Sequence, residues 1–423
     1  MNYKKEDIKQ GITLHKINTN KFKTNLFSIF LTTKLNRENV TKNALLAAVL
    51  RRGTKNLTTQ EQISKTLENM YGASFDCGVE KSGDNHVVKF YLESINNEFL
   101  PTQENLSKEC MEILLDIVFN PYIEDNKFKK EYVDGEKENL KQIIEGKIDN
   151  KARYALDRCI EEMYKNEPYG LYKYGYIEDL EKIDNTNLYE YYKGFIKNAK
   201  IDIFVSGDLD DKIISEIKEN DIIKRLEKRE ADYIENKENK IKEKILEPKI
   251  ITESMQIAQG KLILGLDVLD NNKKSKYQTS VYNVILGGSA NSKMFQNVRE
   301  KASLAYTAGS NYLRQKDNIF IKCGIDIPNY EKALEIIKEQ LKQMENGDFT
   351  EEDIVNAKTI IKASVGSIPE SQDSEITYYF SQELSDEFIS TEEYVKKINE
   401  VNKQQIVDIA KKIQINTVYF LKD

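Results

Sequence analysis

The chain has 423 residues, more than one domain usually contains, which favours two or more domains. Its 63 basic and 70 acidic residues give a net charge of −7, so no broadly basic surface is expected and nucleic acid is excluded as a likely class of partner. No apolar run approaches the roughly 20 residues that span a bilayer and no signal-peptide core follows Met1, so we expect a cytoplasmic protein without membrane association.

The first half of the chain alternates predicted strands and helices. Residues 26–31 and 86–92 are predicted strands, and residues 59–70 between them are a predicted helix. A long helical pattern covers 128–144, and a helix that opens at 183–188 leads into a strand at 201–205. No Gly-x-Gly-x-x-Gly turn accompanies these elements, which argues against a nucleotide-binding parallel sheet.

A strongly charged stretch, residues 224–248, separates this half from the next. Such a run is typical of a solvated linker or an exposed helix, and we assign it no function of its own. Beyond it, predicted strands at 261–266 and 318–323 flank a predicted helix at 279–286.

The two halves repeat one another. The turn and helix at 121–144 have a counterpart at 348–365, and the helix and strand at 183–205 have one at 401–421. A repeat of this length predicts two similarly folded domains, 1–223 and 249–423, joined by the linker. The mixture of elements predicts an α+β fold in which each domain has a mostly antiparallel sheet with helices on one face.

The cysteines and histidines do not form a metal motif. Cys77, Cys110, Cys159 and Cys323 are widely spaced, so we expect reduced, partly buried thiols. His15 and His86 are the only histidines and lie far apart in predicted strands. We therefore expect both to be structural or surface residues, and we expect neither a metal nor another cofactor.

One segment carries a family resemblance. Residues 286–306, Leu-Gly-Gly-Ser-Ala-Asn-Ser-Lys-Met-Phe-Gln-Asn-Val-Arg-Glu-Lys-Ala-Ser-Leu-Ala-Tyr, resemble the second-domain signature of the M16 (insulinase and mitochondrial processing peptidase) metallopeptidases. Arg-Gly-Thr at 52–54 and Tyr-Gly-Ala at 71–73 extend the resemblance into the first half. It implies two homologous domains of the LuxS/MPP-like metallohydrolase fold, and it is closest to short bacterial members, associated with elongation factor P modification, that have lost the zinc motif.

The zinc motif of the family is His-x-x-Glu-His on a helix, where the two His bind zinc and the Glu activates its water. The resemblance places Ala44 and Ala48 at the His positions and Ala47 at the Glu position. Alanine has no lone pair to offer, so no catalytic residue is expected. From the local sequence alone, an ordinary buried helix rich in Ala and Leu is the better interpretation of these residues.

A downstream helix supplies the third zinc ligand in the family, with a second Glu seven residues before it. Glu138 and Glu131 have that spacing and resemble this pair, although a solvated acidic helix face is the stronger explanation because residues 131–145 are rich in charges. A single carboxylate does not supply the roughly 10 kcal/mol with which small zinc sites bind their metal. We therefore predict no stoichiometric zinc and no peptide hydrolysis by the chain alone.

Arg299 and Tyr306 match the second-domain pair that the family places beside the substrate backbone. Both can donate a hydrogen bond to a peptide carbonyl. The alternative is an ion pair for Arg299 and packing within a sheet for Tyr306. Residues 72–77, with Ala73, Ser74 and Phe75, resemble the edge strand along which family members bind an extended peptide, and an edge strand without such a role is the alternative.

These residues lead to one functional hypothesis and two alternatives. Short members of the family join two chains around a chamber, so the resemblance implies a non-catalytic, peptide-binding subunit that pairs with a zinc-bearing M16 homologue. The first alternative is a homodimeric peptide-binding or assembly protein without enzymatic activity. The second is an enzyme with a relocated site that uses Glu138 and a cysteine, which the lack of a nearby histidine disfavours. The substrate would be a peptide or an unfolded polypeptide.

Overall fold

The computed structural model describes residues 2–101, 103–235, 242–270, 275–385 and 388–423. The chain divides into two compact units. Unit 1 comprises Met1–Gly146, Leu171–Glu235 and Pro369–Asp386, and unit 2 comprises Lys147–Gly170, Asn236–Ile368 and Glu387–Asp423. Within the described ranges, no helix has the length and apolar character needed to cross a membrane.

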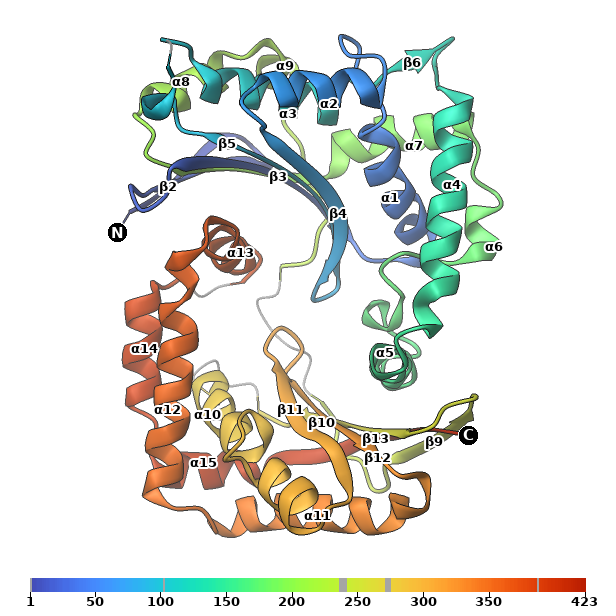
Figure 1. Ribbon diagram of the computed structural model, residues 1–423, viewed down its shortest axis with the longest axis vertical. Helices are drawn as coiled ribbons and strands as arrows, with labels where there is room; N and C mark the ends of the chain where they lie inside the picture. The colour runs from blue at the N-terminus through green and yellow to red at the C-terminus, as the bar shows by residue number, and fades with distance from the viewer. Residues whose placement is uncertain (1, 102, 236–241, 271–274, 386–387) are drawn as a thin grey trace. The chain divides into compact units, whose positions relative to one another are not determined.

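Unit 1 is built on a six-stranded sheet with the strand order β1-β2-β8-β3-β5-β4 (Figure 1). Its strands are β1 (Tyr3–Lys9), β2 (Ile12–Asn18), β3 (Thr24–Lys34), β4 (Ser74–Ser82), β5 (Asn85–Ile95) and β8 (Lys200–Gly207). The pair β2 and β8 is parallel, and the other neighbours are antiparallel. A separate hairpin joins β6 (Ile123–Glu124) and β7 (Lys127–Phe128).

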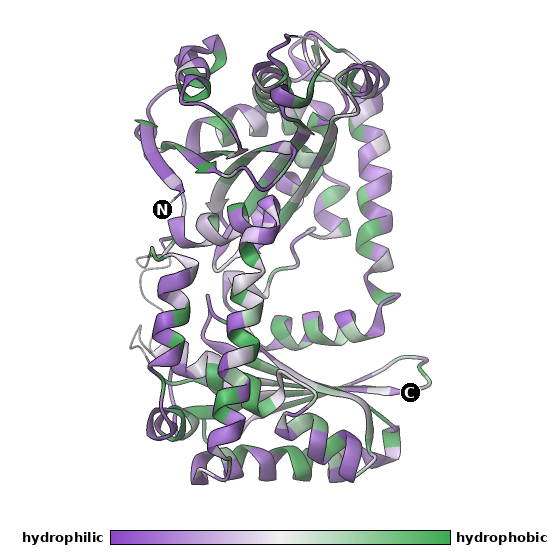
Figure 2. Cartoon of the chain, turned by 60° about the vertical axis from the view of Figure 1, so that its left-hand side comes forward, coloured by the Kyte–Doolittle hydropathy of each residue, from purple (hydrophilic) through white to green (hydrophobic). Residues whose placement is uncertain are grey.

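Alternate residues of β3 point to opposite faces of this sheet. Phe27 and Ile29 face the helix layer, whereas Leu26 and Phe30 pack with helix α13 (Gln372–Glu383). The helix layer contains α1 (Arg37–Leu50), α2 (Gln60–Asn69), α3 (Leu106–Phe119), α4 (Lys130–Glu145), α6 (Ile177–Leu180), α7 (Asn185–Asn198), α8 (Lys212–Glu219) and α9 (Asp221–Arg225). Hydrophobic and hydrophilic residues alternate along most helices, so each has an apolar side to bury (Figure 2).

Unit 2 has a five-stranded sheet with the order β11-β12-β10-β13-β9, in which only β13 and β9 are parallel neighbours. Its strands are β9 (Lys249–Ser254), β10 (Gly260–Val268), β11 (Ala305–Leu313), β12 (Asn318–Ile325) and β13 (Ile413–Lys422). Its helices are α5 (Lys151–Met163), α10 (Ser275–Gly287), α11 (Tyr330–Asn346), α12 (Glu351–Gly366), α14 (Thr391–Asn399) and α15 (Lys403–Ala410), with a π-helical turn at Phe295–Lys301.

The two sheets confirm the internal repeat. Starting from the edge strand β4, the strand order in unit 1 is β4, β5, β3, β8 and β2. Starting from the edge strand β11, the order in unit 2 is β11, β12, β10, β13 and β9. The last pair is parallel and the other pairs are antiparallel in both sequences of strands. Helices α1 and α4 therefore correspond to α10 and α12. The α+β fold predicted from the sequence is confirmed.

The compact units differ from the predicted contiguous domains, 1–223 and 249–423. Helix α5 belongs to unit 2, and α13 belongs to unit 1. Apolar side chains explain this exchange, since Cys159 of α5 packs with Ile263 and Phe320, and Phe380 of α13 packs with Phe30. Each sheet therefore carries helices on both faces, not on one face as the sequence predicted.

The predicted linker, residues 224–248, is not uniformly solvated. Arg229 is 6% exposed and donates to the carbonyl oxygens of Ile196 and Glu227. Lys242 Nζ lies 3.0 Å from Asp267 Oδ1. The central part of the stretch, residues 236–241, lies outside the described residues. Buried and paired residues thus interrupt the predicted solvated stretch, whereas Leu246 near its end is 95% exposed.

Candidate functional site

Helix α1 presents the three alanines to a cavity of about 440 Å³ in unit 1. Ala44 and Ala47 are 6% and 2% exposed, and Ala48 lines the same cavity. Asn36 caps the start of the helix, and its side chain accepts a hydrogen bond from the backbone amide of Asn39 at 2.9 Å. The remaining walls come from β4 and α4, so the cavity lies between α1, an edge strand and a second helix.

The polar side chains of the cavity include an ion pair, and Arg51, Gln60 and Tyr174 also line it. Arg52 Nη1 lies 3.1 Å from Glu136 Oε1, and the Asn139 amide donates to Glu136 Oε2 at the same distance of 3.1 Å. Glu136 is 7% exposed. The carboxylate in the cavity is therefore already balanced by a guanidinium and bonded through both of its oxygens.

The structure corrects the predicted third-ligand position. Glu131 and Glu138 are exposed and do not line the cavity, whereas Glu136, Asn139 and Ile143 do. Residues three and four positions apart, such as 136, 139 and 143, share one face of a helix. Glu138 lies about 200° around α4 from Glu136. The helix predicted from the spacing does line the cavity, but through a different face from the one that carries Glu131 and Glu138.

The cysteine nearest to the alanines is partly buried and hydrogen-bonded. Cys77 of β4 donates its thiol proton to the Ala47 carbonyl, with Sγ 3.2 Å from the oxygen. Burial raises the pKa of the Cys77 thiol to about 12. A protonated thiol is neither a nucleophile nor a good zinc ligand, and the second alternative, a relocated site using Glu138 and a cysteine, has no support because Glu138 is exposed.

The side chains around the cavity do not fit the zinc of the family. They include no histidine, their carboxylate is paired with Arg52, and their thiol is neutral. A cation in this place would also face the positive charge of Arg52. No step through a metal is derived for this cavity.

A different group in unit 1 brings metal-ligating residue types together. Within the described part of the chain, one set has its ligand atoms within 4.8 Å of one another: His15, Asp202 and Glu383. Sequence analysis missed it, because Glu383 reaches His15 only through the packing of α13. His15 was predicted to be structural or a surface residue, and it is fully buried.

Hydrogen bonds already occupy this buried group. His15 bonds to Asp202 Oδ1 through Nε2 at 3.0 Å and to the Tyr3 hydroxyl through Nδ1 at 2.7 Å. Lys200 pairs with Asp202, and Lys5 Nζ lies 2.6 Å from Glu383 Oε2. Burial alone would raise the pKa of Asp202, but Lys200 and His15 hold it low, at about 2. Two ammonium groups thus supply the positive charge that a metal would otherwise bring.

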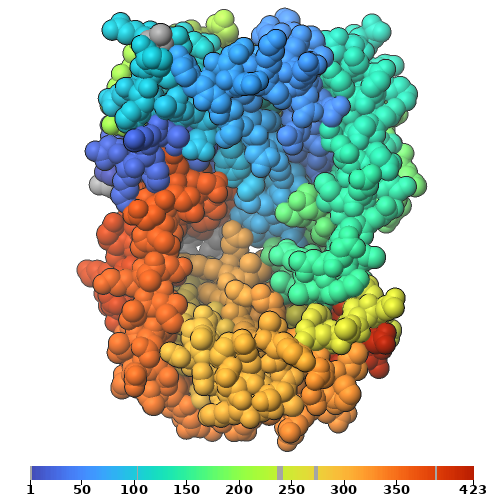
Figure 3. All heavy atoms as spheres, in the orientation of Figure 1, coloured from blue at the N-terminus to red at the C-terminus, as the bar shows by residue number. Residues whose placement is uncertain are grey.

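The predicted edge strand is confirmed as an element of the fold. Strand β4 pairs only with β5 and forms one edge of the sheet of unit 1. Ser74 is exposed, Phe75 packs partly on the core, and Ala73 immediately precedes the strand. Blue atoms in the place of β4 lie at the molecular surface in Figure 3.

Arg299 and Tyr306 both lie in unit 2. Arg299 is in the π-helical turn, where its guanidinium lies 4.5 Å from the centre of the Phe295 ring and Nε lies 3.5 Å from Glu300 Oε1. Tyr306 is 64% exposed at an irregularity in the pairing of β11 with β12. The tyrosine is therefore not packed in the sheet, and the ion pair of Arg299 is with its own exposed neighbour.

Comparisons with known proteins identify the family. A family model described as Peptidase M16 inactive domain matches residues 182–361. The Bacillus subtilis (strain 168) protein named Probable inactive metalloprotease YmfF is 36% identical over 414 residues, covering 97% of this chain and 96% of that protein. This chain belongs to the M16 peptidase family. It is a pseudo-peptidase of that family, in agreement with the name of its 36% identical relative, and its two histidines do not form a His-x-x-Glu-His motif.

Further M16 relatives and a solved structure agree with this assignment. The uncharacterized zinc protease YmxG, also from Bacillus subtilis (strain 168), is 24% identical and covers 72% of each chain. A conserved protein from Enterococcus faecalis V583 has a crystal structure with a TM-score of 0.91 and 27% identity, covering 100% of this chain and 99% of that one. The fold of that Enterococcus faecalis protein thus extends over the whole of this chain.

Proposed function

We propose that this M16 pseudo-peptidase is a cytoplasmic, non-catalytic subunit that binds extended peptide and pairs with a zinc-bearing M16 homologue. The observation that carries the proposal is an asymmetric loss. The cavity of unit 1 holds three alanines and an ion pair in place of a zinc site, whereas Arg299 and Tyr306 remain accessible in unit 2.

The two retained side chains suit a substrate peptide. The guanidinium of Arg299 and the phenol of Tyr306 donate hydrogen bonds to carbonyl oxygens without acting as nucleophiles. Donors placed where negative charge develops on a carbonyl are worth about 10²–10³ in rate in other hydrolases. In a complex, they would serve the zinc site of the other subunit.

The free edge of β4 supports the peptide-binding part of the proposal. An edge strand offers main-chain N–H and C=O groups to an extended segment, which gives affinity with little sequence preference. The comparisons support pairing with a zinc-bearing homologue, because one organism, Bacillus subtilis, contains both a relative named as an inactive metalloprotease and relatives named as zinc proteases.

The test is reconstitution. The chain is mixed with a His-x-x-Glu-His M16 homologue from the same genome, and cleavage of a quenched fluorescent peptide is followed together with the mass of the complex. We expect a heterodimer and at least about tenfold faster cleavage than by the homologue alone. Arg299→Ala and Tyr306→Phe should each remove most of this gain.

A control variant separates this role from loss of folding. Lys338, exposed on α11 and remote in sequence from both residues, is changed to Ala and should leave the gain intact. A stable self-dimer that neither binds nor activates any zinc-bearing homologue would overturn the proposal and favour the homodimeric alternative.

A further inference from the structure

A second cavity, of about 810 Å³, lies in unit 2 along the free edge of β11. It is lined by α10, β11 and α12, the counterparts of the helix, edge strand and second helix around the alanines of unit 1. Its side chains are hydroxyls, amides, aliphatic groups and two cations, Arg314 and Lys322, and its described lining includes no Asp or Glu. This composition is unusual in a chain with a net charge of −7.

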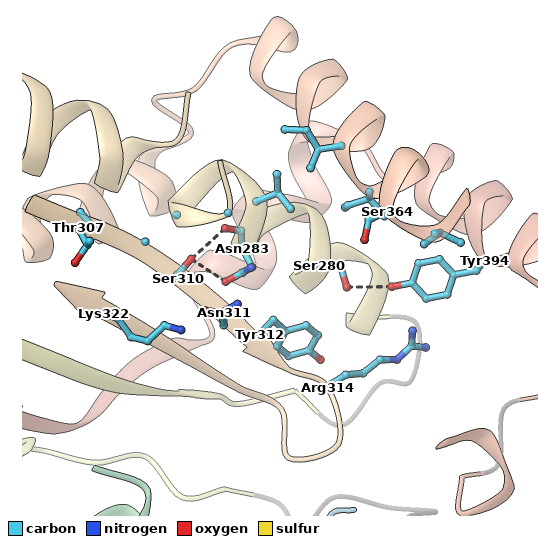
Figure 4. A pocket seen from close by; sticks show the side chains of 18 of the residues that line it. Ser280, Asn283, Thr307, Ser310, Asn311, Tyr312, Arg314, Lys322, Ser364 and Tyr394 are labelled. Atoms are coloured by element: carbon cyan, nitrogen blue, oxygen red, sulfur yellow. Dashed lines mark hydrogen bonds between the residues drawn. The ribbon is translucent and has the colours of Figure 1, made fainter. Parts of the chain in front are cut away.

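The edge strand forms a fixed wall of this groove. Ser310 Oγ donates to Asn283 Oδ1 of α10 at 2.8 Å, and Figure 4 shows the two side chains directed toward each other. A Cβ on Gly287 would lie 2.5 Å from the Ser310 nitrogen, so the end of α10 packs directly on β11. Among the described residues, the outer main-chain groups of β11 have no neighbouring strand, because β11 pairs there only with β12.

The lining reaches both faces of the sheet. On the helix side it includes Ile360 of α12, which is 37% exposed. On the other side it includes Ala152 of α5 and Lys322, which lies two residues from Phe320 on β12 and so shares its face, where α5 packs. A strand added beside β11 would direct alternate side chains to these two sides.

Lys322 is the specific feature of the second side. Its register partner on β11 is Gly309, so the position directly opposite has no side chain to cover it. No hydrogen bond or ion pair of its ammonium is found within the described ranges of the chain. Burial, together with the nearby charge of Arg153, lowers the pKa of Lys322. A carboxylate brought close to the Lys322 ammonium would favour its charged form and offset the repulsion from Arg153.

We propose that the groove along β11 binds an extended acidic peptide as an added strand, with alternate carboxylate side chains at Lys322 and alternate apolar side chains toward Ile360. Main-chain hydrogen bonds to β11 would give affinity, and the lysine would give the preference for acidic residues. The inference extends the proposed function to a peptide chemistry, rests only on peptide binding, and does not require a zinc-bearing partner.

The test uses the full chain alone and labelled nine-residue peptides, the length of β11. Peptides of alternating Glu and Val, Gln and Val, and Lys and Val, all with amidated ends, are compared by fluorescence anisotropy. We expect the Glu peptide to bind about tenfold more tightly than the Gln peptide and the Lys peptide to bind most weakly. N-methylation of alternate amides on the edge that pairs with β11 should abolish binding.

Variants of Lys322 assign the preference to this groove. Lys322→Gln should remove the preference for Glu over Gln, and Lys322→Glu should reverse it in favour of the Lys peptide. Lys338→Gln is the matched control and should bind as the wild type does. A reversal by Lys322→Glu also shows that the variant is folded, because a misfolded chain would lose binding of every peptide.

Other outcomes are equally decisive. Equal binding of the three peptides, no binding of any of them, or an unchanged preference in Lys322→Gln would overturn the proposal. A Gln peptide with a free carboxyl end that binds as the Glu peptide does would identify a chain terminus as the source of the carboxylate at Lys322. Failure to activate a zinc-bearing homologue would count against the proposed function alone, since binding is measured without that partner.

Discussion

Arg52 and Glu136 form an ion pair with an N–O distance of 3.1 Å in the cavity beside the three alanines. Their side chains are 30% and 9% exposed, so the carboxylate is the more buried partner. In this M16 pseudo-peptidase, a guanidinium thus supplies positive charge to the cavity where the family resemblance implies a zinc site. Arg52 lies in the turn that follows α1 and Glu136 lies on α4, so their pairing ties this turn to α4.

Removing the guanidinium should cost more stability than removing the carboxylate. Arg52→Ala leaves a buried carboxylate unpaired, so we expect a loss of about 2–3 kcal/mol in the free energy of unfolding, against about 1 kcal/mol for Glu136→Gln. Glu138→Gln, at an exposed position of the same helix, is the control and should change it by less than about 0.5 kcal/mol. Urea unfolding measures all three, and equal effects at Glu136 and Glu138 would contradict the assignment of faces.

Restoring the motif should restore zinc binding only in part. Ala44→His, Ala47→Glu and Ala48→His together supply two imidazoles, but Glu136 stays paired with Arg52. Adding Arg52→Met frees that carboxylate and removes a repelling charge, so zinc should bind at least about tenfold more tightly than in the triple variant. Competition with a chromophoric chelator gives both affinities. If Glu136→Ala does not reverse the gain, Glu136 is not the third ligand.

The Cys77 thiol should react slowly. Its pKa is raised to about 12 by burial, so its thiolate fraction at neutral pH is about a thousandfold below that of an ordinary thiol of pKa 9.0. The rate of alkylation by iodoacetamide should rise about tenfold per pH unit between neutral pH and about pH 10. The Cys77→Ser variant identifies the signal against the three buried cysteines. A rate like that of free cysteine at neutral pH would show that Cys77 is activated.

Acid should destabilise unit 1 through His86. The Asn43 amide, fixed by the Tyr191 hydroxyl, donates to Nδ1, and Nε2 donates to the Lys173 carbonyl, so the hydrogen bonds suit the neutral ring. Burial lowers the pKa of His86 to about 3. The unfolded chain, with a pKa of about 6.5, binds the proton first, so this contribution is complete above about pH 6.5 and is lost as the pH falls toward 3.

The expected size of the effect is measurable. Between pH 7 and about pH 4.5, protonation of His86 should reduce the free energy of unfolding by about 2–3 kcal/mol. His86→Gln does not titrate, so its stability should fall less steeply over the same range in urea unfolding experiments. Parallel pH profiles of the variant and the wild type would show that other groups carry the acid sensitivity.

The sequence by itself determined the features that depend on residue type and on short-range periodicity. Alanine at 44, 47 and 48 cannot bind a metal in any conformation, and two histidines cannot form the zinc motif. The alternation of apolar residues predicted β3, β5, β10 and β12, and the repeated helix and strand patterns predicted two similar halves. These properties are local, so they can be inferred before the chain is folded.

Only the tertiary structure decided which residues meet. The rotation of α4 about its axis places Glu136, not Glu138, at the cavity, and that rotation is set by packing against α1. Helix α5 packs in unit 2 and α13 packs in unit 1 because the apolar face of each helix is buried against the other half of the chain. The packing of α13 also brings Glu383 close to His15. The groove beside β11 likewise arises where three elements meet, because a free strand edge is a property of the assembled sheet.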